Sequence, residues 1–380
     1  MVRKCRPPPQ LTRSGELPTV TQATAKKFRV ILWGTGFVGK LVIRELLSHP
    51  RFELVAVIVH DPLKDGEDVG SLAGLAPVGL RATTDVAAAL QVPADALAYY
   101  GPTAQFAAQN IENMSQALRA GMDVVSTAMT PFVYPKACPP QLTEPLEKVC
   151  QETGKSCFTT GIDPGFANDL LPLVLMGLCG RVDRVRIQEI LDYASYTGDY
   201  APMGIGRPVE EKALLENSQV LIFAWGHTVY MIADALGATL ENVDTVYEKW
   251  PAPERIVFQN GVIEPGHTGA VRFEIRGFVA GEARIILEHC NRITTAAAPE
   301  WPRTKLFEND CYRVVLEGSP DITQETALRG AGGDPNAGGC LATGMRAIQA
   351  IPAVCAAPPG LLSALDLPLI PGWGNLRPPG

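Results

Sequence analysis

One segment near the N-terminus constrains the fold of this chain more than any other. Gly34-Thr35-Gly36-Phe37-Val38-Gly39 has the pattern G-x-G-x-x-G. The apolar run 28–33 before it predicts a buried strand, apolar residues at helical spacing follow it, and 54–59 predicts a second strand. A strand, glycine turn, helix and strand within about thirty residues form the context in which this pattern binds a dinucleotide. We therefore predict an α/β fold with a Rossmann-like, doubly wound parallel sheet.

Each glycine of the turn has its own expected role. Gly34 allows the tight turn, Gly36 has no Cβ to keep a diphosphate from the backbone, and Gly39 lets the helix lie against the strand. Free N–H groups at the helix N-terminus favour the phosphates. The alternative is a glycine-rich turn without a ligand. The predicted cofactor-binding residues here are Gly34, Thr35, Gly36, Phe37, Val38 and Gly39.

The end of the second strand indicates which nicotinamide cofactor fits. A carboxylate at this position holds the ribose hydroxyls of NAD. The chain instead has His60, followed by Asp61 and, after two residues, Lys64. His60 and Lys64 could together bind the 2′-phosphate of NADP, whereas Asp61 could accept from the ribose one residue late. We predict NADP, with NAD as the alternative, and count His60 and Lys64 among the cofactor-binding residues.

The alternation of strands and helices continues to residue 160. Helices are predicted at 85–90, 104–120 and 140–153, and strands at 96–100, 123–127 and 156–160. Ligands of a doubly wound sheet lie outside the carboxyl ends of its strands. This rule adds five predicted cofactor-binding residues: Tyr100, Gly101, Pro102, Thr103 and Thr127. We divide this half of the chain into a disordered extension, 1–27, and a dinucleotide-binding domain, 28–160.

The pattern changes after residue 169. A helix at 170–178 leads into alternating segments typical of strands at 185–193, 243–250, 254–258, 269–279, 283–289 and 311–317, with helices at 209–215 and 218–236. We predict a second α+β domain, 161–335, on a mixed or antiparallel sheet. The glycine-rich run 331–339 is expected to link this domain to the tail 339–357, which is predicted to be helical until Pro352. Residues 336–380 are expected to return to the first domain. The segment 196–207 is either a lid or an ordinary surface loop.

Composition excludes several classes of function. There are 33 Lys and Arg against 40 Asp and Glu, so no basic surface suited to nucleic acid is expected. No apolar run reaches the roughly 20 residues that span a bilayer. The 9 cysteines form no C-x-x-C, which favours a reducing compartment, and we predict the cytoplasm. No metal-ligand spacing appears, so no metal is predicted.

Hydride transfer requires a protein that binds a C=O or C=N carbon and handles one proton. The predicted catalytic residues are Asp163, Glu189 and Tyr196. Their alternative roles are a turn cap before Pro164, an ion pair in the sheet and core packing. Three further residues are predicted to contact a small-molecule substrate: Asn168, Met129 and His227. In its aromatic surroundings, His227 could instead be structural.

Four segments of the sequence resemble those of a known family. Besides the glycine turn, they are Gly-Ile-Asp-Pro-Gly at 161–165, Ile-Glu-Pro-Gly at 263–266 and Ala-Ile-Pro-Ala-Val-Cys-Ala-Ala at 350–357. They resemble the relatives of dihydrodipicolinate reductase that include 2,4-diaminopentanoate dehydrogenases and native NAD(P)-dependent amine dehydrogenases. The resemblance implies an NAD(P)-dependent oxidoreductase that transfers a hydride between nicotinamide and a small imine, amine or carbonyl compound. It also implies a homodimer formed through the sheet of the second domain.

The sequence departs from this family at two places. The reductases proper use a histidine pair with a downstream lysine, and this chain has no His-His. The amine dehydrogenases have an acidic pair after the strand that matches 124–127, where this chain reads Ala128-Met129-Thr130-Pro131. The amine dehydrogenases tend to have Asn where this chain has Asp163. Asp163 could therefore supply a carboxylate from another wall of the cleft. A carbonyl or ene reductase of a specialised pathway, or a catalytically silent NADP-sensing regulator, are the alternatives.

Overall fold

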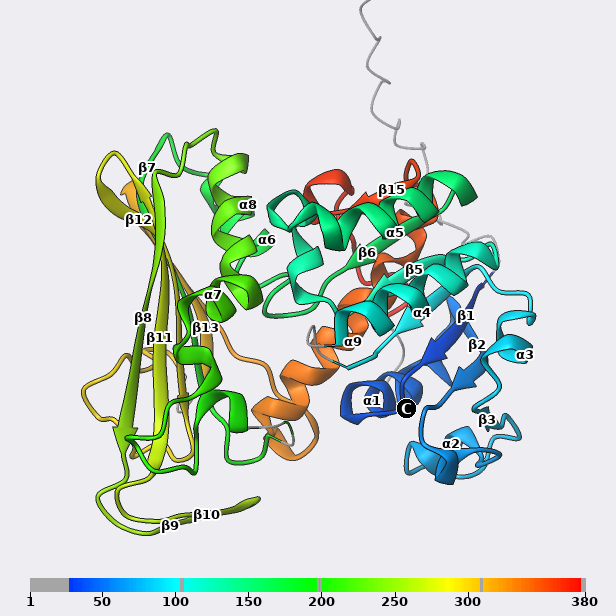
Figure 1. Ribbon diagram of the computed structural model, residues 1–380, viewed down its shortest axis with the longest axis horizontal. Coiled ribbons are helices and arrows are strands. Elements are labelled where there is room, and N and C mark those ends of the chain that lie inside the picture. The colour runs from blue at the N-terminus through cyan, green and yellow to red at the C-terminus, as the bar shows by residue number, and fades with distance from the viewer. Residues whose placement is uncertain (1–26, 103–105, 197, 199, 308–309, 377–380) are drawn as a thin grey trace, which may run out of the picture.

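The computed structural model describes residues 27–102, 106–196, 198, 200–307 and 310–376. Two β-sheets stand at opposite ends of the molecule, and a long helix, α9 (Pro335–Val354), runs between them (Figure 1). The predicted extension 1–27 lies outside the described residues except for Lys27. Among the described residues, no helix combines the length and the apolar character needed to cross a membrane.

The first sheet has seven strands, all parallel, in the order β15-β6-β5-β4-β1-β2-β3. The strands are β1 (Phe28–Trp33), β2 (Phe52–Ile58), β3 (Ala82–Thr83), β4 (Ala96–Tyr99), β5 (Asp123–Ser126), β6 (Ser156–Thr159) and β15 (Gly360–Leu362). Helices cover both faces, as predicted for a doubly wound sheet. They are α1 (Phe37–Leu46), α2 (Val69–Leu72), α3 (Val86–Leu90), α4 (Ala107–Arg119) and α5 (Pro140–Thr153).

Each face of this sheet has its own apolar core. One core joins the sheet to α1, α2 and α9, and the other joins it to α3, α4 and α5. Strand β1 pairs with β2 on one side and with β4 on the other. The strand order therefore reverses at β1, and the crevice beside its carboxyl end is where ligands of such sheets bind.

The second sheet has six strands in the order β14-β13-β7-β12-β11-β8. Their bounds are β7 (Arg181–Asp192), β8 (Asn242–Pro251), β11 (Thr268–Val279), β12 (Glu282–Arg292), β13 (Cys311–Ser319) and β14 (Ile322–Thr326). The sheet is mixed, because β7 and β12 pair in parallel and the other neighbours are antiparallel. A separate hairpin is formed by β9 (Ile256–Phe258) and β10 (Gly261–Ile263).

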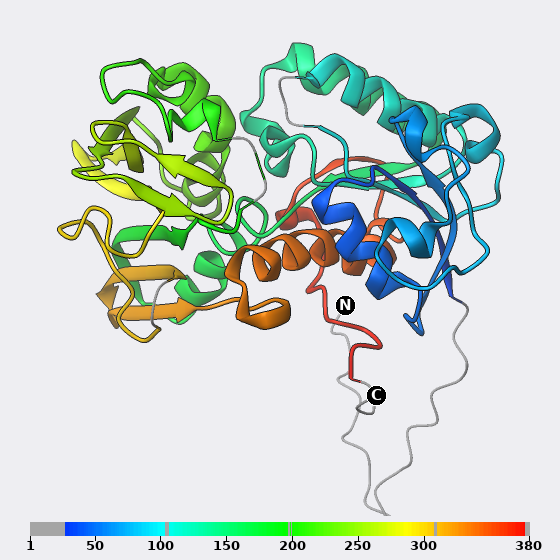
Figure 2. The ribbon, with the colours of Figure 1, turned by 90° about the horizontal axis from the view of Figure 1, so that it is seen from below.

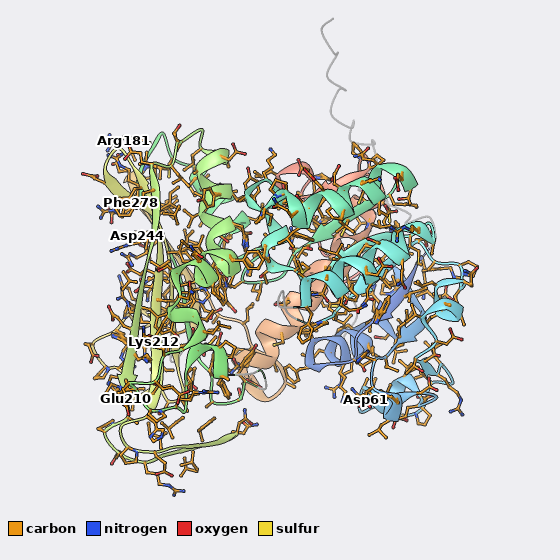
Figure 3. The ribbon with its side chains drawn as sticks, viewed as in Figure 1. Asp61, Arg181, Glu210, Lys212, Asp244 and Phe278 are labelled. Atoms are coloured by element: carbon orange, nitrogen blue, oxygen red, sulfur yellow. The ribbon has the colours of Figure 1, made fainter. Side chains whose placement is uncertain are left out.

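The two faces of the second sheet differ in chemistry because side chains alternate along a strand. Ile187, Phe273 and Leu287 face an apolar core with α6 (Leu170–Met176), α7 (Ser218–Leu221) and α8 (His227–Ala235). A π-turn, Ile222–Gly226, connects α7 to α8. The other face has ion pairs such as Arg272 to Glu288, and Asp244 and Phe278 mark its β8–β11 side in Figure 3.

Helix α9 brings the end of the chain back to the first sheet. A Cβ added at Gly344 would lie 2.3 Å from Val42, so only glycine lets α9 approach α1 this closely. Beyond α9, β15 pairs with β6 and extends the first sheet (Figure 2). Asp61, on the loop after β2, lies at the far end of the molecule from β8 (Figure 3). Helix α9 packs into a core of the first sheet, and near its start Asn336 donates to the Asp192 carbonyl oxygen at the end of β7.

Three predicted helices have different bounds in the structure. The helix predicted at 209–215 is wrong: only a short 3₁₀ turn, Leu214–Glu216, forms, because the charged residues 210–212 are exposed and offer no apolar face. Helix α6 ends at Met176 rather than 178. Helix α9 begins at Pro335, where Asp334 accepts from the Asn336 amide, and continues past Pro352 to Val354. In the last turn the missing proline N–H costs only one hydrogen bond.

Candidate active site

The glycine turn lies where β1 gives way to α1. Gly34 has φ 111°, and a Cβ there would lie 2.3 Å from the Tyr100 carbonyl oxygen. A Cβ at Gly39 would lie 2.0 Å from the Gly34 carbonyl oxygen. A Cβ at Gly36 would meet no atom within 4 Å. Two of these glycines are therefore required by packing, whereas the third borders open space.

That open space is a crevice of about 280 Å³ beside the N-terminus of α1. Its lining is Gly36, Phe37, Val38, Gly39, Tyr100, Gly101, Thr127, Tyr196, Gly198 and Cys340. Free amides at a helix N-terminus next to a backbone without a Cβ suit a diphosphate. The residues present therefore fit a dinucleotide. A larger depression of about 340 Å³, near Arg181 and Arg284, shares no residue with this crevice.

The remaining predicted cofactor residues that the structure describes are not among the lining residues of this crevice. The Lys64 ammonium reaches back to the glycine turn, with Nζ 3.4 Å from the Thr35 carbonyl oxygen and 3.5 Å from Thr35 Oγ1. His60 is exposed at the end of β2. Asp61 accepts from the Leu63 amide at 3.0 Å and caps a short turn. Pro102 accepts from Asn110, and Thr103 lies outside the described residues.

Three ionisable side chains from three different segments meet in one buried cluster. Asp163 follows β6, Glu189 belongs to β7, and His289 is its partner in register on β12. The distance from His289 Nε2 to Asp163 Oδ2 is 3.2 Å, and that from His289 Nδ1 to Glu189 Oε1 is 3.3 Å. The side chains are only 1 to 6% exposed. We refer to Asp163, Glu189 and His289 as the Asp–His–Glu cluster.

The sequence predicted two members of this cluster and missed His289. A signal was present, because strand alternation places His289 on the same face as Ile285 and Leu287, which is the core side. A histidine on an apolar face needs a buried partner. The three residue types can also bind a metal ion, a grouping that the sequence did not predict. Each imidazole nitrogen, however, already faces a carboxylate oxygen, which suits a protonated ring.

Two asparagines hold the carboxylates of the cluster. Asn168 Nδ2 donates to Asp163, and Asn291 Nδ2 donates to Glu189 at 2.8 Å. These bonds fix the orientation of both amides. Among the described residues of this site, three buried oxygens then lack a hydrogen-bond donor: Oδ1 of Asp163, of Asn168 and of Asn291. Buried acceptors without a donor are costly, so the site favours a ligand with several N–H groups.

The protonation states follow from burial and from the mutual charges. Burial, reinforced by Glu189 and opposed by His289, raises the pKa of Asp163 to about 7. Burial alone would lower the pKa of His289, but Asp163 and Glu189 outweigh it and raise that pKa to about 10. The pKa of Glu189 is lowered, since His289 and the hydrogen bonds to its carboxylate outweigh burial. Near neutral pH, Asp163 is therefore the member that gains or loses a proton.

Aromatic rings surround the imidazole and connect the cluster to the crevice. Phe273 stacks on His289 at 4.5 Å, and Trp225 of the π-turn meets it edge-on at 5.3 Å. On the other side, Tyr193 donates to Glu189 at 2.9 Å and stacks on Tyr196 at 4.8 Å. Because Tyr196 lines the crevice, it links the predicted cofactor site to the buried cluster. Tyr193 and Tyr196 thus connect Glu189 to the crevice, and the catalytic roles of Asp163, Glu189 and Tyr196 stay predictions.

The two other predicted substrate residues, His227 and Met129, are both buried. His227 is the first residue of α8 and is buried; in the part of the chain that the structure describes, neither ring nitrogen has a hydrogen-bond partner. Burial lowers its pKa to about 3, so the ring is neutral. Met129 packs in the apolar core under α4 and α5. Their roles in substrate binding stay predictions.

Comparison with known proteins agrees with this architecture. Residues 28–128 match the family model of the dihydrodipicolinate reductase N-terminus, and residues 166–376 match that of the 2,4-diaminopentanoate dehydrogenase C-terminal domain. An amine dehydrogenase from Streptomyces virginiae is 36% identical over 351 residues, which cover 91% of this chain and 98% of the relative. A 2,4-diaminopentanoate dehydrogenase from Acetoanaerobium sticklandii is 25% identical over 90% of this chain and 94% of its own.

The fold has a solved counterpart as well. The structure of an amine dehydrogenase from Mycobacterium smegmatis superposes with a TM-score of 0.74 at 21% identity and covers 92% of this chain and 98% of its own. The expected resemblance and the fold class are both confirmed. The chain belongs to the family of amine dehydrogenases and 2,4-diaminopentanoate dehydrogenases and is an NAD(P)-dependent oxidoreductase.

Proposed function

We propose that this protein is an NADP(H)-dependent amine dehydrogenase. It interconverts a ketone or aldehyde, ammonium and NADPH with an amine, NADP⁺ and water. The observation that carries this proposal is the set of three buried oxygens without a donor, on Asp163, Asn168 and Asn291. An ammonium ion or a protonated amine has at least three N–H groups to donate to these oxygens and an iminium nitrogen has two, whereas a carbonyl oxygen has none.

The charge of the cluster supports a cationic group. Glu189 is ionised, His289 is protonated, and Asp163 is partly ionised near neutral pH. The net charge therefore lies between zero and −1. A cation at this place relieves the cost of a buried, partly compensated carboxylate. A nitrogen that becomes positive during the reaction is stabilised in the same way.

Asp163 is the proposed proton donor and acceptor. A carboxyl group with a pKa of about 7 has both forms available at neutral pH, which favours general acid–base catalysis. Ala128, Met129 and Thr130 stand where the resemblance places the acidic pair of the amine dehydrogenases. Asp163 approaches from the loop after β6 instead. Glu189 keeps its negative charge and stabilises His289.

The glycine turn would hold the dinucleotide. Gly36 and the first amides of α1 would bind its diphosphate, and its nicotinamide would supply or accept the hydride. Lys64 supports the choice of NADP, since its ammonium already lies beside Thr35 of the turn. The 2′-phosphate of NADP could form an ion pair with this ammonium, whereas NAD has no phosphate at that position. Asp61 accepts from the Leu63 amide with Oδ1, and its carboxylate is the group on which the alternative of NAD rests.

A homodimer is proposed through the face of the second sheet that lies opposite the helices. On this face Arg272 binds Glu248, Glu274 and Glu288 at 2.5 to 2.9 Å, and Arg186 binds Glu274 and Glu288. Arg272 and Arg186 are 18% and 32% exposed. A flat, charge-balanced sheet face suits a second copy of itself. Light scattering of the purified protein tests this, and a monomer would contradict it.

The direct test measures NADPH oxidation with a panel of aliphatic and aromatic ketones and aldehydes, each with and without ammonium. The proposal predicts turnover that depends on ammonium and yields the amine. Equal turnover without ammonium would contradict it in favour of a carbonyl reductase. NADPH binding without turnover across the panel would contradict it in favour of a cofactor-sensing regulator.

A further inference from the structure

We propose that His289 is a positioning residue that ties the proton-transferring carboxylate to the second sheet through both ring nitrogens. The inference rests on the proposed function, because it concerns the same site. Asp163 belongs to a loop of the first sheet, after β6, whereas Glu189 and His289 lie side by side on β7 and β12 of the second. His289 therefore spans the two halves of the molecule at the site of chemistry.

The doubly protonated ring is the form that suits this position. A neutral imidazole has one donor and one acceptor, so one of the two carboxylates would face a lone pair. The protonated ring instead puts a positive charge at ion-pair distance from both carboxylates, with Nε2 3.2 Å from Asp163 Oδ2 and Nδ1 3.3 Å from Glu189 Oε1. The Nε2 contact is an ion pair without hydrogen-bond geometry. The stacked ring of Phe273, at 4.5 Å, adds a negative π-face to a cation. Packing and charge thus select the same state.

Other titratable groups near the cluster are neutral over the working range. Tyr193, directly after β7, and Tyr312 on β13 have strongly raised pKa values, mainly through burial. Burial raises the pKa of Cys340 on α9 to about 11. Among the titratable groups that face it, only the two carboxylates therefore balance the imidazolium. Removing the ring leaves both carboxylates buried without their cation.

The consequence for Asp163 concerns both its position and its proton. Without the ring, the loop after β6 loses its link to β12, and a shift of about 1 Å can lower a rate about 100-fold. Without the positive charge, burial and Glu189 act unopposed and hold the proton on Asp163 to higher pH. A residue that only filled space would affect stability and leave the pH dependence of the rate unchanged.

The test compares His289→Gln with His267→Gln, a histidine on the turn before β11. Each variant is assayed for kcat and for KM of NADPH from pH 5 to pH 10. For His289→Gln we expect kcat to fall about 100-fold, KM of NADPH to change less than about twofold, and the pH break near 7 to move upward by about one unit or more. His267→Gln should match the wild type. An unmoved pH break in a folded His289→Gln enzyme would overturn the proposal.

A second measurement does not require the variant to fold. Ring ¹⁵N shifts of His289 in the wild-type protein with NADP⁺ bound report whether both nitrogens carry protons at pH 8. We expect the doubly protonated ring; a ring that loses its proton near pH 6.5 would overturn the inference. If turnover proved independent of ammonium, the proposed function would fail, while this spectrum would still decide the state of His289.

Discussion

Replacing Asp163 by Asn removes the proposed proton site with little change of shape. The amide keeps the volume of the carboxyl group, and its oxygen can still accept from Asn168. It cannot take up or release a proton between pH 4 and pH 10. The catalytic effect and the structural effect of the change can therefore be separated.

The magnitude follows from the pKa of about 7. At pH 7 about half of the enzyme carries the protonated carboxyl, so acid and base forms are both present. General acid–base catalysis by one group contributes about 10²–10⁴ in rate, or about 3–5 kcal/mol of barrier. We expect kcat of Asp163→Asn to fall by about that factor at pH 7 and its pH profile to lose the break near 7.

The stability of Asp163→Asn should not fall with its kcat. Burial raises the folded-state pKa from 3.8 to about 7, so the carboxyl stabilises the fold fully below pH 3.8 and this contribution is lost as pH rises through 7. The loss is about 4 kcal/mol. The amide does not suffer it, and the free energy of unfolding of Asp163→Asn at pH 8 should be no lower than that of the wild type in urea titrations.

The matched control is Asp169→Asn. Asp169 is also buried, and burial raises its pKa to about 6, but its carboxylate accepts from the Gly165 and Leu170 amides and caps α6. This variant should lose stability and keep the pH break near 7. If Asp163→Asn retained activity within about threefold of the wild type, or kept the same break, the assignment of the proton to Asp163 would be refuted.

Three further outcomes are expected. Gly36→Val should fold with a free energy of unfolding within about 0.5 kcal/mol of the wild type, because its side chain enters open space. The same side chain should weaken NADPH binding at least about tenfold by calorimetry. Gly34→Ala, at φ 111° and 2.3 Å from a carbonyl oxygen, should instead lose about 1–3 kcal/mol of its free energy of unfolding. Equal effects of the two variants on binding and stability would contradict these roles. Lys64→Met should raise KM for NADPH about tenfold and leave KM for NADH nearly unchanged, and a parallel rise of both would argue against a 2′-phosphate contact. Because its pKa is raised to about 10, protonated His289 stabilises the fold fully below pH 6.5, and this contribution is lost as pH rises through 10. The free energy of unfolding should therefore fall by about 5 kcal/mol across that range. If its slope against pH were unchanged in His289→Gln, the raised pKa of His289 would not be the cause.

The first sheet was predictable because its signals are local. The glycine turn, the apolar runs and the helical spacing around α1 and α5 each lie within a few residues, and α5 was predicted with its bounds at 140 and 153. The two shortest strands of this sheet were not predicted, because so few residues carry little local signal. Strands β3 and β15 have two and three residues, and their pairing depends on neighbours far away in the sequence.

The site was only partly predictable because its contacts are long-range. Asp163 and Glu189 could be selected as carboxylates at expected sheet positions. The link between them depends on the register of β7 and β12, which places residues 189 and 289 side by side. Strand alternation indicates that His289 faces the core, but the parallel pairing that brings it beside Glu189 is set by packing of the whole second sheet. Asn291, which orients Glu189, was missed for the same reason.

The central claim is that the substrate nitrogen binds at the Asp–His–Glu cluster, between Asp163 and the amide oxygens of Asn168 and Asn291. A crystal structure of the protein with NADP⁺ and an amine product tests this most directly. The account predicts the amine nitrogen within hydrogen-bonding distance of Asp163 Oδ1 and of at least one of the two amide oxygens. An amine bound with its nitrogen directed away from Asp163, beside a correctly seated nicotinamide, would contradict it.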